Sequence, residues 1–436
     1  MLGAMTTTTA PFDPTDRAHT ADPAPHLAAA RHGCPVSRPR PGLVVLAADT
    51  DVRAGLKDIA RFSNRGAFSL DGDAVLPVPM ITMTDPPEHT ELRAHLKHWF
   101  SPPALRRLEP RVREIVEEVV RTLPTTGTFD LYDACVRAVP SRVVFALIGL
   151  PSAEWDGIER LADRVAEDLP GPVHLLPEFG ELMARLTAVL DRREAAGPTG
   201  TDVIDGLLHP GDGERALSRA EVLTHLTQLV MAGTDTTRSA ATNLLHELLV
   251  DPSRWERVRA ERELLPGAVE ESLRHDAPLQ YVLRSARTDT EVQGEPVAAG
   301  EKVLLSVQSA NWDTTRWGAD ADAFSLDRLT PAAHLSFGLG IHTCLGPRWP
   351  ASRSGCSSTC CSTTTRACAW PTASAGRRWT GRCCGGPVAS TWWSADPAGP
   401  VELAADTRRQ IVDQSVRLVS NLDLASSPTV EVHCRS

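Results

Sequence analysis

A short run at residues 334–346, H-L-S-F-G-L-G-I-H-T-C-L-G, places three glycines around one cysteine, Cys344. Closely spaced glycines let a backbone turn sharply and approach a flat ligand. A cysteine in such a loop can present a thiolate sulfur at a fixed height, which is what a haem iron needs from a proximal sulfur ligand. The alternative is a buried, inert thiol, the usual state of a free cysteine. The rest of the chain must therefore decide what Cys344 does.

A second polar segment, residues 84–93, reads T-D-P-P-E-H-T-E-L-R. A capping residue ahead of proline, with an acid in the first turn, predicts that a helix starts here. His89 and Arg93 are four residues apart, so they share one face of that helix. They form either a solvated polar face or, in a partly buried site, two cationic donors that suit two carboxylates.

A long apolar helix is predicted from the capping box of Ser218 and Glu221 to Val250, where Asp-Pro ends it. At 1.5 Å per residue it spans roughly 45–50 Å, enough to cross a domain. Its centre, residues 232–237, reads A-G-T-D-T-T, and glycine and threonine are poor helix formers. Threonine hydroxyls can also bond back to carbonyls and bend the helix. A weak centre in a long buried helix costs stability, so it indicates function unless packing alone requires a kink.

The elements around these motifs are mostly helical. Helical patterns cover residues 104–122, 131–150 and, interrupted by prolines, 152–215. A short apolar run at 43–46 predicts a strand, and the stretch 290–307, with glycines between its apolar segments, predicts a small β-sheet. The sequence therefore predicts a mainly α protein with a small β region.

The composition argues against several classes of protein. The chain has 436 residues, with 45 Lys and Arg against 55 Asp and Glu, for a net charge of −10. A nucleic-acid binder would normally carry a basic face. The sequence has no apolar run as long as a transmembrane helix needs and no basic segment followed by an apolar core, as in a signal peptide. We therefore expect a soluble cytoplasmic protein that engages neither nucleic acid nor membrane.

Together these motifs resemble the cytochrome P-450 family. Residues 337–346 match its pattern F-G-x-G-x-H-x-C-x-G, residues 85–93 match D-P-P-x-H-x-x-x-R, and residues 232–236 match A-G-x-[DE]-T. All occur in the family's order between positions 43 and 346. The resemblance implies the cytochrome P-450 fold, in which a long kinked central helix lies over haem b (iron protoporphyrin IX).

The resemblance implies a role for each matched residue. Cys344 would be the axial thiolate, which pushes electron density into the iron and favours O–O cleavage. On the distal side, Thr236 would hold a water or bound oxygen and Asp235 would relay protons. The residues that would contact the cofactor, the basic ones through its propionates, are His89, Arg93, Arg284, Phe337, Gly338, Gly340 and His342. The nearby Arg287 is an alternative to Arg284.

The E-x-x-R pair of Glu271 and Arg274 is by itself a common surface pair worth little. In this position it resembles the family's buried E-x-x-R, which an arginine from a later F-x-x-x-R segment locks. Residues 324–328 supply that segment and its Arg328. The implied role of the three residues is structural, because a buried ion pair needs a third partner.

The implied function is that of a monooxygenase, which inserts one oxygen atom from O2 into a small apolar substrate, as a hydroxyl or an epoxide, in natural-product metabolism. No flavin or nicotinamide fingerprint is visible, so electrons must come from outside, and the family implies a ferredoxin and its reductase. We expect a monomer. The alternative is a non-catalytic haem-binding protein or an inactive pseudo-enzyme. A carrier would not need the proton chemistry of Asp235 and Thr236.

The resemblance stops after Gly346. We expect a flexible leader at 1–40, a cytochrome P-450 domain at 41–346 and an aberrant tail at 347–436. The family continues with a helix of the type A-A-L-A-R-x-E, whereas this chain has prolines at 347 and 350, which forbid a regular helix there. Six cysteines and five tryptophans then crowd residues 349–393. The cysteine spacing fits no familiar zinc pattern, and cytoplasmic proteins rarely carry disulfides.

Our hypothesis is that a shift of reading frame produces this tail. If the codons mostly end in G or C and are read from their third base, residues 347–356 become A-L-A-R-L-E-V-G-V, the missing family helix. Residues 381–394 become P-V-L-R-G-P-G-G-L-H-V-V-V, which resembles the family's last strand. The tail is therefore predicted to be out of frame and poorly ordered. A chain made as written would lack the helix that supports the haem.

Overall fold

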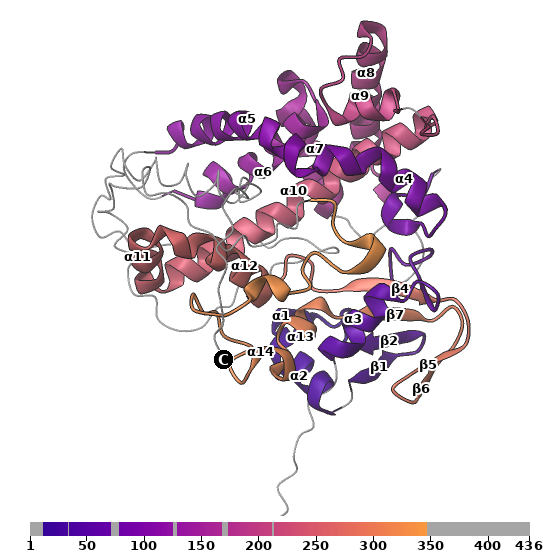
Figure 1. Ribbon diagram of the computed structural model, residues 1–436, viewed down its shortest axis with the longest axis vertical. Helices are drawn as coiled ribbons and strands as arrows, with labels where there is room; N and C mark the ends of the chain where they lie inside the picture. The colour runs from indigo at the N-terminus through magenta and orange to yellow at the C-terminus, as the bar shows by residue number, and fades with distance from the viewer. Residues whose placement is uncertain are drawn as a thin grey trace, which may run out of the picture.

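The computed structural model describes residues 12–33, 35–70, 78–124, 129–167, 173–211 and 213–346. Figure 1 shows helices filling most of the molecule and a small sheet at one side. The predicted class, mainly α with a small β region, is confirmed. Among the helices in these ranges, none combines the length and apolarity that a membrane span needs. The predicted tail at 347–436 lies outside the described residues.

The central helix is α10, Arg219–Val250, which runs unbroken for 32 residues. Its predicted start is confirmed, because Ser218 caps it and the side chain of Glu221 completes the capping box. The helix crosses the molecule (Figure 1) and packs against α6 (Ala138–Ile148) and α12 (Leu265–His275). Tertiary packing of this kind supplies the stability that a helix with a weak centre lacks on its own.

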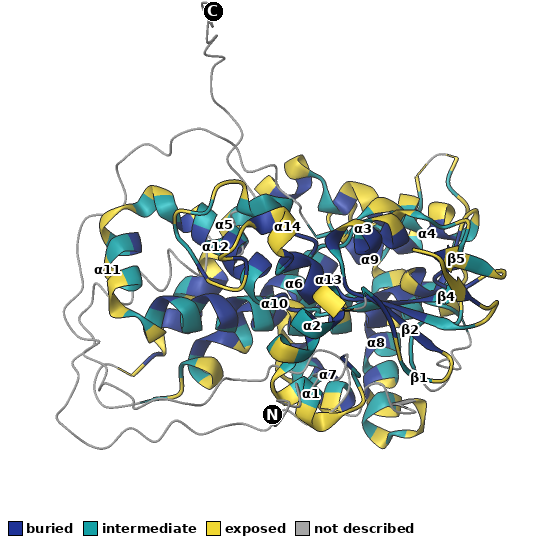
Figure 2. Cartoon of the chain, turned by 90° about the horizontal axis from the view of Figure 1, so that it is seen from below, coloured by how far each residue is buried: buried dark blue, intermediate teal, exposed yellow. Residues whose placement is uncertain are grey.

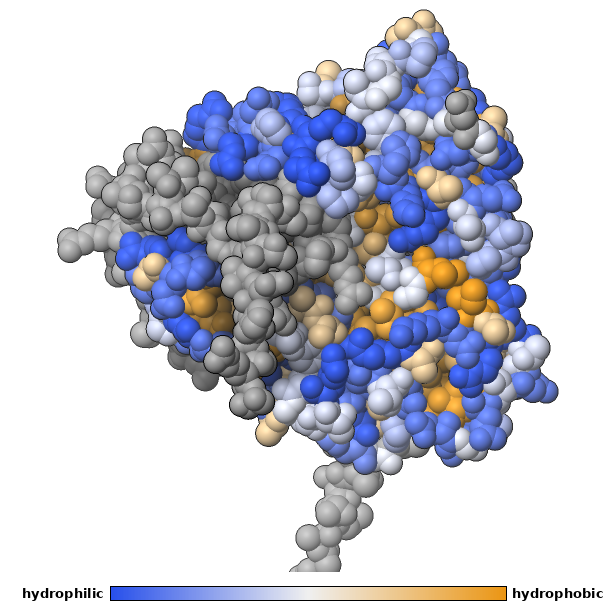
Figure 3. All heavy atoms as spheres, in the orientation of Figure 1, coloured by the Kyte–Doolittle hydropathy of each residue, from blue (hydrophilic) through white to orange (hydrophobic). Residues whose placement is uncertain are grey.

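The other helices cover the core with one side and face water with the other, except the five-residue α1, which has no buried residue. They are α1 (Arg17–Ala21), α2 (Pro23–Gly33), α3 (Asp49–Lys57), α4 (Glu88–Lys97), α5 (Pro102–Arg121), α7 (Trp155–Glu167), α8 (Pro177–Ala196), α9 (Val203–Leu208), α11 (Pro252–Ala260), α13 (Val307–Asn311) and α14 (Thr314–Trp317). Figure 2 shows their inner sides buried, and Figure 3 shows hydrophilic side chains over the outer sides of α5 and α7. The helix predicted over 131–150 is divided into a π-helical turn, Tyr132–Val136, and α6.

The main sheet has five strands in the order β1-β2-β7-β4-β3. They are β1 (Val36–Arg40), β2 (Leu43–Leu46), β3 (Phe62–Ser63), β4 (Val282–Ala286) and β7 (Lys302–Leu305), and β2 runs parallel to β7 while the other neighbours are antiparallel. All of β2 is buried, as in a strand covered on both faces, and the predicted strand is confirmed. In the region 290–307, where a small sheet was predicted, β5 (Thr290–Val292) and β6 (Glu295–Val297) form an antiparallel hairpin. The strand β7, which follows them in the sequence, belongs to the main sheet.

The prediction of a flexible leader is wrong for residues 12–40, apart from the undescribed position 34. They form α1, α2 and β1, and Leu27 and Ala30 of α2 are buried. Arg31 Nη1 also donates to Ser309 Oγ at 3.1 Å, which fastens α2 to α13. Alanine is the best helix former. An alanine-rich helix with few large apolar side chains shows little amphipathic pattern, however, and this hid α2 in the sequence.

A buried ion-pair cluster ties α12 to the segment that leads to the cysteine loop. Glu271 and Arg274 are 1% and 0% exposed, and Arg328 donates from Nε to Glu271 Oε1 at 2.8 Å. Arg274 donates to Glu271 from Nε and Nη2, both at 2.8 Å. Its Nη1 donates to the carbonyl oxygens of Asn311 and Ala321. Each charge of the cluster therefore has partners, which a buried ion pair requires.

Removing the cation at the centre of this cluster should cost stability. Arg274→Met leaves Glu271 buried with one partner fewer, so we expect the free energy of unfolding to fall by roughly 3–5 kcal/mol. Arg257→Met breaks an exposed ion pair with Asp327. It is the matched control and should have little effect, because water screens exposed pairs. Urea unfolding followed by circular dichroism measures both variants, and equal losses would show that the buried cluster is dispensable.

Candidate functional site

The cysteine loop, residues 334–346, folds back on itself. Gly338 and Gly340 have φ angles of 69° and 81°, in the left-handed region that glycine adopts without strain. The N–H of Cys344 donates to the carbonyl oxygen of Phe337 at 2.9 Å. The three predicted loop residues therefore fix where the sulfur of Cys344 lies.

Residues distant in the sequence hold this loop in place. Asn311 of α13 accepts a backbone N–H of the loop at 2.8 Å, and Ser336 Oγ donates to the carbonyl oxygen of Leu273 of α12 at 2.5 Å. Arg93 of α4 donates from Nη2 to the carbonyl oxygen of Thr343 at 2.7 Å. In Figure 1 the orange segment that contains the loop lies between α10 and the sheet. Two helices from the later part of the chain and one from the earlier part thus position the cysteine.

The two cysteines that the structure describes have different surroundings. Cys135 is buried in the helical core, whereas Cys344 is exposed. A buried, inert thiol therefore describes Cys135. Although Cys344 is accessible, the protein atoms around it raise the pKa of its thiol by burial, and the N–H of Gly346 and the charge of Arg93 oppose this rise. Both opposing groups favour the thiolate form.

Four basic side chains gather beside the loop. His89 of α4 and His342 of the loop have ring centroids 4.1 Å apart. Their Nε2 atoms are buried and have no hydrogen-bond partner among the residues that the structure describes. Burial lowers the pKa of His342 to about 3, and the charges of His89, Arg284 and Arg93 lower it further. The structure thus brings together the four basic residues that the sequence assigned to the cofactor.

This basic cluster, formed by His89, Arg93, Arg284 and His342, owes its positive charge near neutral pH to Arg93 and Arg284, because the pKa values of both histidines are lowered. Asp85 is the acid whose charge acts on His89, Arg284 and His342, and it is already paired with Arg287 at 2.6 Å. Burial lowers the pKa of Arg284 to about 10. Buried donors without partners are costly. The basic cluster therefore fits a ligand that carries two carboxylates.

The structure also separates Arg284 from its alternative, Arg287. Arg287 donates from Nε to the carbonyl oxygen of Ile59 at 2.9 Å and from Nη2 to Asp85. Arg284 is 5% exposed and acts on His342. Arg284 donates from Nη1 to the carbonyl oxygen of its neighbour Leu283 at 2.8 Å but has no carboxylate partner among the described residues, whereas Arg287 is paired with Asp85, so the geometry favours Arg284 as the cofactor-facing arginine.

The middle of α10 is uncovered although the helix crosses the core. Ala232 and Thr236 are exposed, so the described side chains leave this face open. Thr236 Oγ1 donates to the carbonyl oxygen of Ala232 at 2.8 Å, the back-bonding that the sequence predicts for this centre. Leu345 of the cysteine loop and Met231 of α10 both pack against the large helical core cluster, of which Val230 of α10 is a member.

Asp235 contacts a residue that the sequence analysis missed. Its Oδ1 lies 3.5 Å from Nη1 of Arg238, which also binds Asp163 of α7. Burial raises the pKa of Asp235 to about 6, while Arg238 opposes this rise and Asp163 adds to it. A carboxyl group with such a pKa can take up and release protons near neutral pH. The i,i+3 spacing of Asp235 and Arg238 on one helix was the signal that could have indicated their contact.

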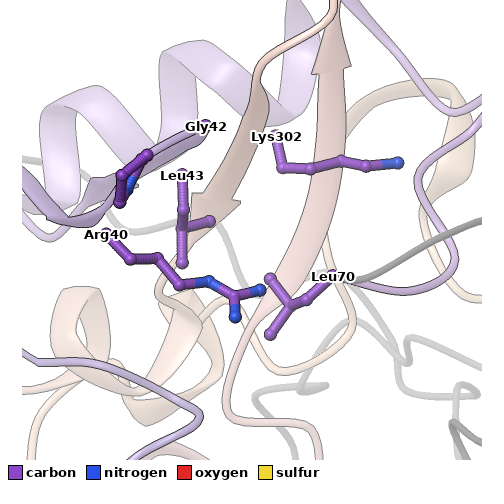
Figure 4. A pocket seen from close by; sticks show the side chains of 6 residues that line it. Arg40, Gly42, Leu43, Leu70 and Lys302 are labelled. Atoms are coloured by element: carbon purple, nitrogen blue, oxygen red, sulfur yellow. The ribbon is translucent and has the colours of Figure 1, made fainter.

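Two surface pockets lie away from these residues. One, of about 280 Å³, is lined by Arg40 of β1, Gly42 of the β1–β2 turn and Lys302 of β7 (Figure 4). A second, of about 550 Å³, has His98 and Trp99 in its lining. None of the predicted site residues lines either pocket, so neither pocket is the candidate site.

Known proteins similar to this chain come from one family. A family model described as cytochrome P-450 matches residues 186–349. The erythromycin C-12 hydroxylase of Saccharopolyspora erythraea is 33% identical over 73% of this chain and 81% of its own length. The mycinamicin IV hydroxylase/epoxidase of Micromonospora griseorubida is 33% identical over 72% of this chain and 80% of its own length. Cytochrome P-450 CYP109Q5 from Chondromyces apiculatus has a similar solved structure, with a TM-score of 0.68 at 30% identity over 76% of this chain and 85% of that one.

Gly340 tests whether the loop needs its close approach to α3. A Cβ atom at Gly340 would lie 3.0 Å from the carbonyl oxygen of Leu56, whereas one at Gly300, also at positive φ, would meet nothing within 4 Å. Gly300→Ala should cost only left-handed backbone strain, about 1–2 kcal/mol. Gly340→Ala should cost more, because the backbone of α3 must also move. Urea unfolding curves give the difference, and equal losses would mean that Leu56 does not constrain the loop.

Proposed function

Because this chain belongs to the cytochrome P-450 family, whose members bind haem b, we propose that Cys344 is the axial thiolate of a monooxygenase acting on a small apolar natural product. The enzyme class, an oxidoreductase of the cytochrome P-450 monooxygenase type, follows from the family and from relatives named as hydroxylases. One observation carries the site assignment. An exposed cysteine in a glycine-bent loop lies beside buried basic donors that lack partners among the described residues. A flat ligand with two carboxylates, such as haem, fits both features.

The basic cluster would hold the cofactor by its propionates. His89 and His342 would donate from their unpartnered Nε2 atoms, and Arg284 from its buried guanidinium. Charge-assisted bonds of this kind are strong, and they would relieve the cost of burying unpaired donors. Arg93 would have a second role besides binding a propionate. It donates to the carbonyl oxygen of Thr343 in the cysteine loop, and its charge lowers the pKa of Cys344. Haem, when bound, supplies the redox chemistry that splits O2, so that one oxygen atom enters the substrate and the other leaves as water.

Thr236 and Asp235 would handle protons on the distal side. The hydroxyl of Thr236, which donates to Ala232 in this structure, can rotate to hold a water on the uncovered face of α10. Burial gives Asp235 a pKa of about 6, so its carboxyl group can pass protons toward that water near neutral pH. The two residues would thus move protons without themselves being changed.

The substrate class is argued from two relatives. One is named an erythromycin C-12 hydroxylase and the other a mycinamicin IV hydroxylase/epoxidase. By analogy, we propose that this chain hydroxylates or epoxidises a small apolar natural product. The electrons would come from a ferredoxin and its reductase, because the sequence shows no flavin or nicotinamide fingerprint of its own.

A rival function, that of a non-catalytic haem-binding protein or an inactive pseudo-enzyme, depends on the tail. The match to the family model ends at residue 349, close to Gly346, after which we propose that the reading frame shifts. If the codons mostly end in G or C, with suitable Ser and Arg codons, the shifted frame of residues 347–356 would read A-L-A-R-L-E-V-G-V and supply the helix that the family places against the haem. A chain made as written would keep the bonds of the cysteine loop to earlier residues but would lack that helix.

The absorption spectrum under carbon monoxide tests the ligand. We expect the reduced chain, with its frame restored after Gly346, to show the red-shifted Soret band of a haem thiolate. Cys344→Ser should lose this band while its circular dichroism stays unchanged. Cys135→Ser, at the buried cysteine, is the control and should keep the band. A band that survives in Cys344→Ser would exclude Cys344 as the ligand.

The same spectrum tests the tail. The chain as written should retain less haem than the frame-restored chain, because it lacks the supporting helix. Resequencing the DNA around codon 347 is the direct check of the frame. An intact frame there would refute the frameshift, and equal haem content in the two chains would show that the helix is not needed.

Replacing Thr236 should uncouple the enzyme. In Thr236→Ala, reductant consumption should continue while the product formed per reductant consumed falls roughly a hundredfold, since a positioned proton donor is lost. Thr237→Ala is the matched control, because Thr237 Oγ1 bonds back to Gly233 in the same way at 3.0 Å but on a half-buried side of α10. A substrate from a binding-spectrum screen is used for all variants. Unchanged coupling in Thr236→Ala, or equal loss in Thr237→Ala, would contradict the role of Thr236.

A further inference from the structure

A buried arginine one turn beyond Asp235 has no part in the chemistry described so far. Arg238 is 4% exposed and lies where α10 meets α6 and α7. Its Nε donates to the carbonyl oxygen of Arg137 at 2.9 Å. Its Nη2 donates to Ser141 Oγ and to Glu159 Oε1, both at 2.6 Å. These contacts fix the guanidinium from the turn before α6, from α6 itself and from α7.

The other terminal nitrogen of Arg238 is shared unequally between two carboxylates. Nη1 lies 2.5 Å from Asp163 Oδ1 and 3.5 Å from Asp235 Oδ1. Hydrogen bonds weaken as they lengthen, so Asp163 has the strong bond and Asp235 the weak one. The side chain of Asp235 is also 46% exposed, so water can reach it. Asp235 is therefore kept beside the guanidinium without being tied to it.

The charged and titratable groups that face Asp235 come from α10, α7 and the segment before α6. Arg238, Asp163 and Tyr132 interact with Asp235 itself, whereas Glu159 and Arg137 contact Arg238. Three carboxylates thus meet one buried guanidinium. The excess negative charge opposes ionisation of the least tightly bound carboxyl group. Together with burial, the charge of Asp163 accordingly raises the pKa of Asp235.

We propose that Arg238 and Asp163 are positioning residues for Asp235. Arg238 keeps the carboxyl group beside α7. Asp163 accepts the short hydrogen bond from Nη1 of Arg238, so Asp235 is left free to exchange a proton with water. This proposal rests on the proposed function, in which Asp235 relays protons toward Thr236. Only O–H bonds form and break in the transfer, since the proton passes from water to the carboxylate and on to a second water.

The unequal sharing of Arg238 Nη1 between Asp163 and Asp235 suits a proton relay, because it keeps the pKa of Asp235 from becoming either very low or very high. If Nη1 bonded Asp235 closely, a charge-assisted bond would stabilise the ionised carboxylate and lower its pKa. If the guanidinium were absent, the neighbouring carboxylates would keep Asp235 protonated. A relay group works best when its pKa lies near the working pH, because it must both accept and release the proton. The arrangement with Asp163 places Asp235 between these extremes.

Infrared titration of the full chain measures this arrangement without turnover. The C=O stretch of a protonated carboxyl group that is lost in Asp235→Asn reports on Asp235. In Asp163→Asn, Nη1 can close on Asp235 and a neighbouring negative charge is gone. We therefore expect the midpoint of that band to move to lower pH by roughly one unit. Glu159→Gln is the matched control, because it removes a charge at Nη2, which Asp235 does not share, and it should move the midpoint much less.

An unshifted midpoint in Asp163→Asn, or an equal shift in Glu159→Gln, would overturn the proposal. If Asp163→Asn does not fold, Asp163→Ser removes the same charge and repeats the measurement. In the working enzyme, the pH above which coupled oxidation falls should also move lower in Asp163→Asn, since the protonated form of Asp235 is then lost at lower pH. An infrared shift with an unchanged turnover profile would support the positioning by Asp163 and overturn the relay role of Asp235.

Discussion

The proposed role of Cys344 as a thiolate ligand requires its sulfur to carry charge among protein atoms, and the other groups of the proposed site depend on this constraint. Burial raises the pKa of the Cys344 thiol, and the N–H of Gly346 and the charge of Arg93 oppose it. The dependence is mutual, because burial lowers the pKa of Arg93 and the charge of Cys344 offsets that effect. Arg93 also fixes the carbonyl of Thr343. One side chain on α4 thus influences both the position of the sulfur and its readiness to ionise.

The basic cluster and the Glu271–Arg274 cluster show how a binding site differs from a structural ion pair. Around Glu271, every charge is matched by acceptors or donors within the protein. In the basic cluster, the Nε2 atoms of His89 and His342 lack partners among the described residues, and burial lowers the pKa of Arg284 to about 10. An unpaired buried donor costs roughly 1–3 kcal/mol. The fold gives up stability at this place, and a dianionic ligand can restore it.

The features that the sequence predicted correctly depend on residues that are close together in the chain. The capping box of α10, the strand β2 and the glycine-bent loop of Cys344 depend on residues that are close in sequence, and their elements lie where the sequence predicts. Helix α2 was missed because alanines leave no apolar stripe. The bond between Arg238 and Asp163 joins residues 75 positions apart, and that between Arg93 and Thr343 joins residues 250 apart. No local period connects such pairs, so only the fold reveals them.

The residues that hold the cysteine loop all precede it in the sequence, and this limits which properties of the proposed site the tail can affect. The cysteine loop is bent by its own glycines and held by Asn311, Leu273 and Arg93, all of which precede it. Among the described residues, the bonds that hold the loop all come from the chain before it or from the loop itself. By the proposed frameshift, the chain as written loses the helix that the family packs against the haem, so we expect weaker retention of the cofactor. Loss of Arg93 would act differently, since it would displace Thr343 and leave the thiolate without its nearest cation. An altered tail should therefore weaken cofactor retention and leave the proposed thiolate normal. Loss of Arg93 should alter the thiolate and leave the fold intact. The two defects would arise from separate parts of the chain.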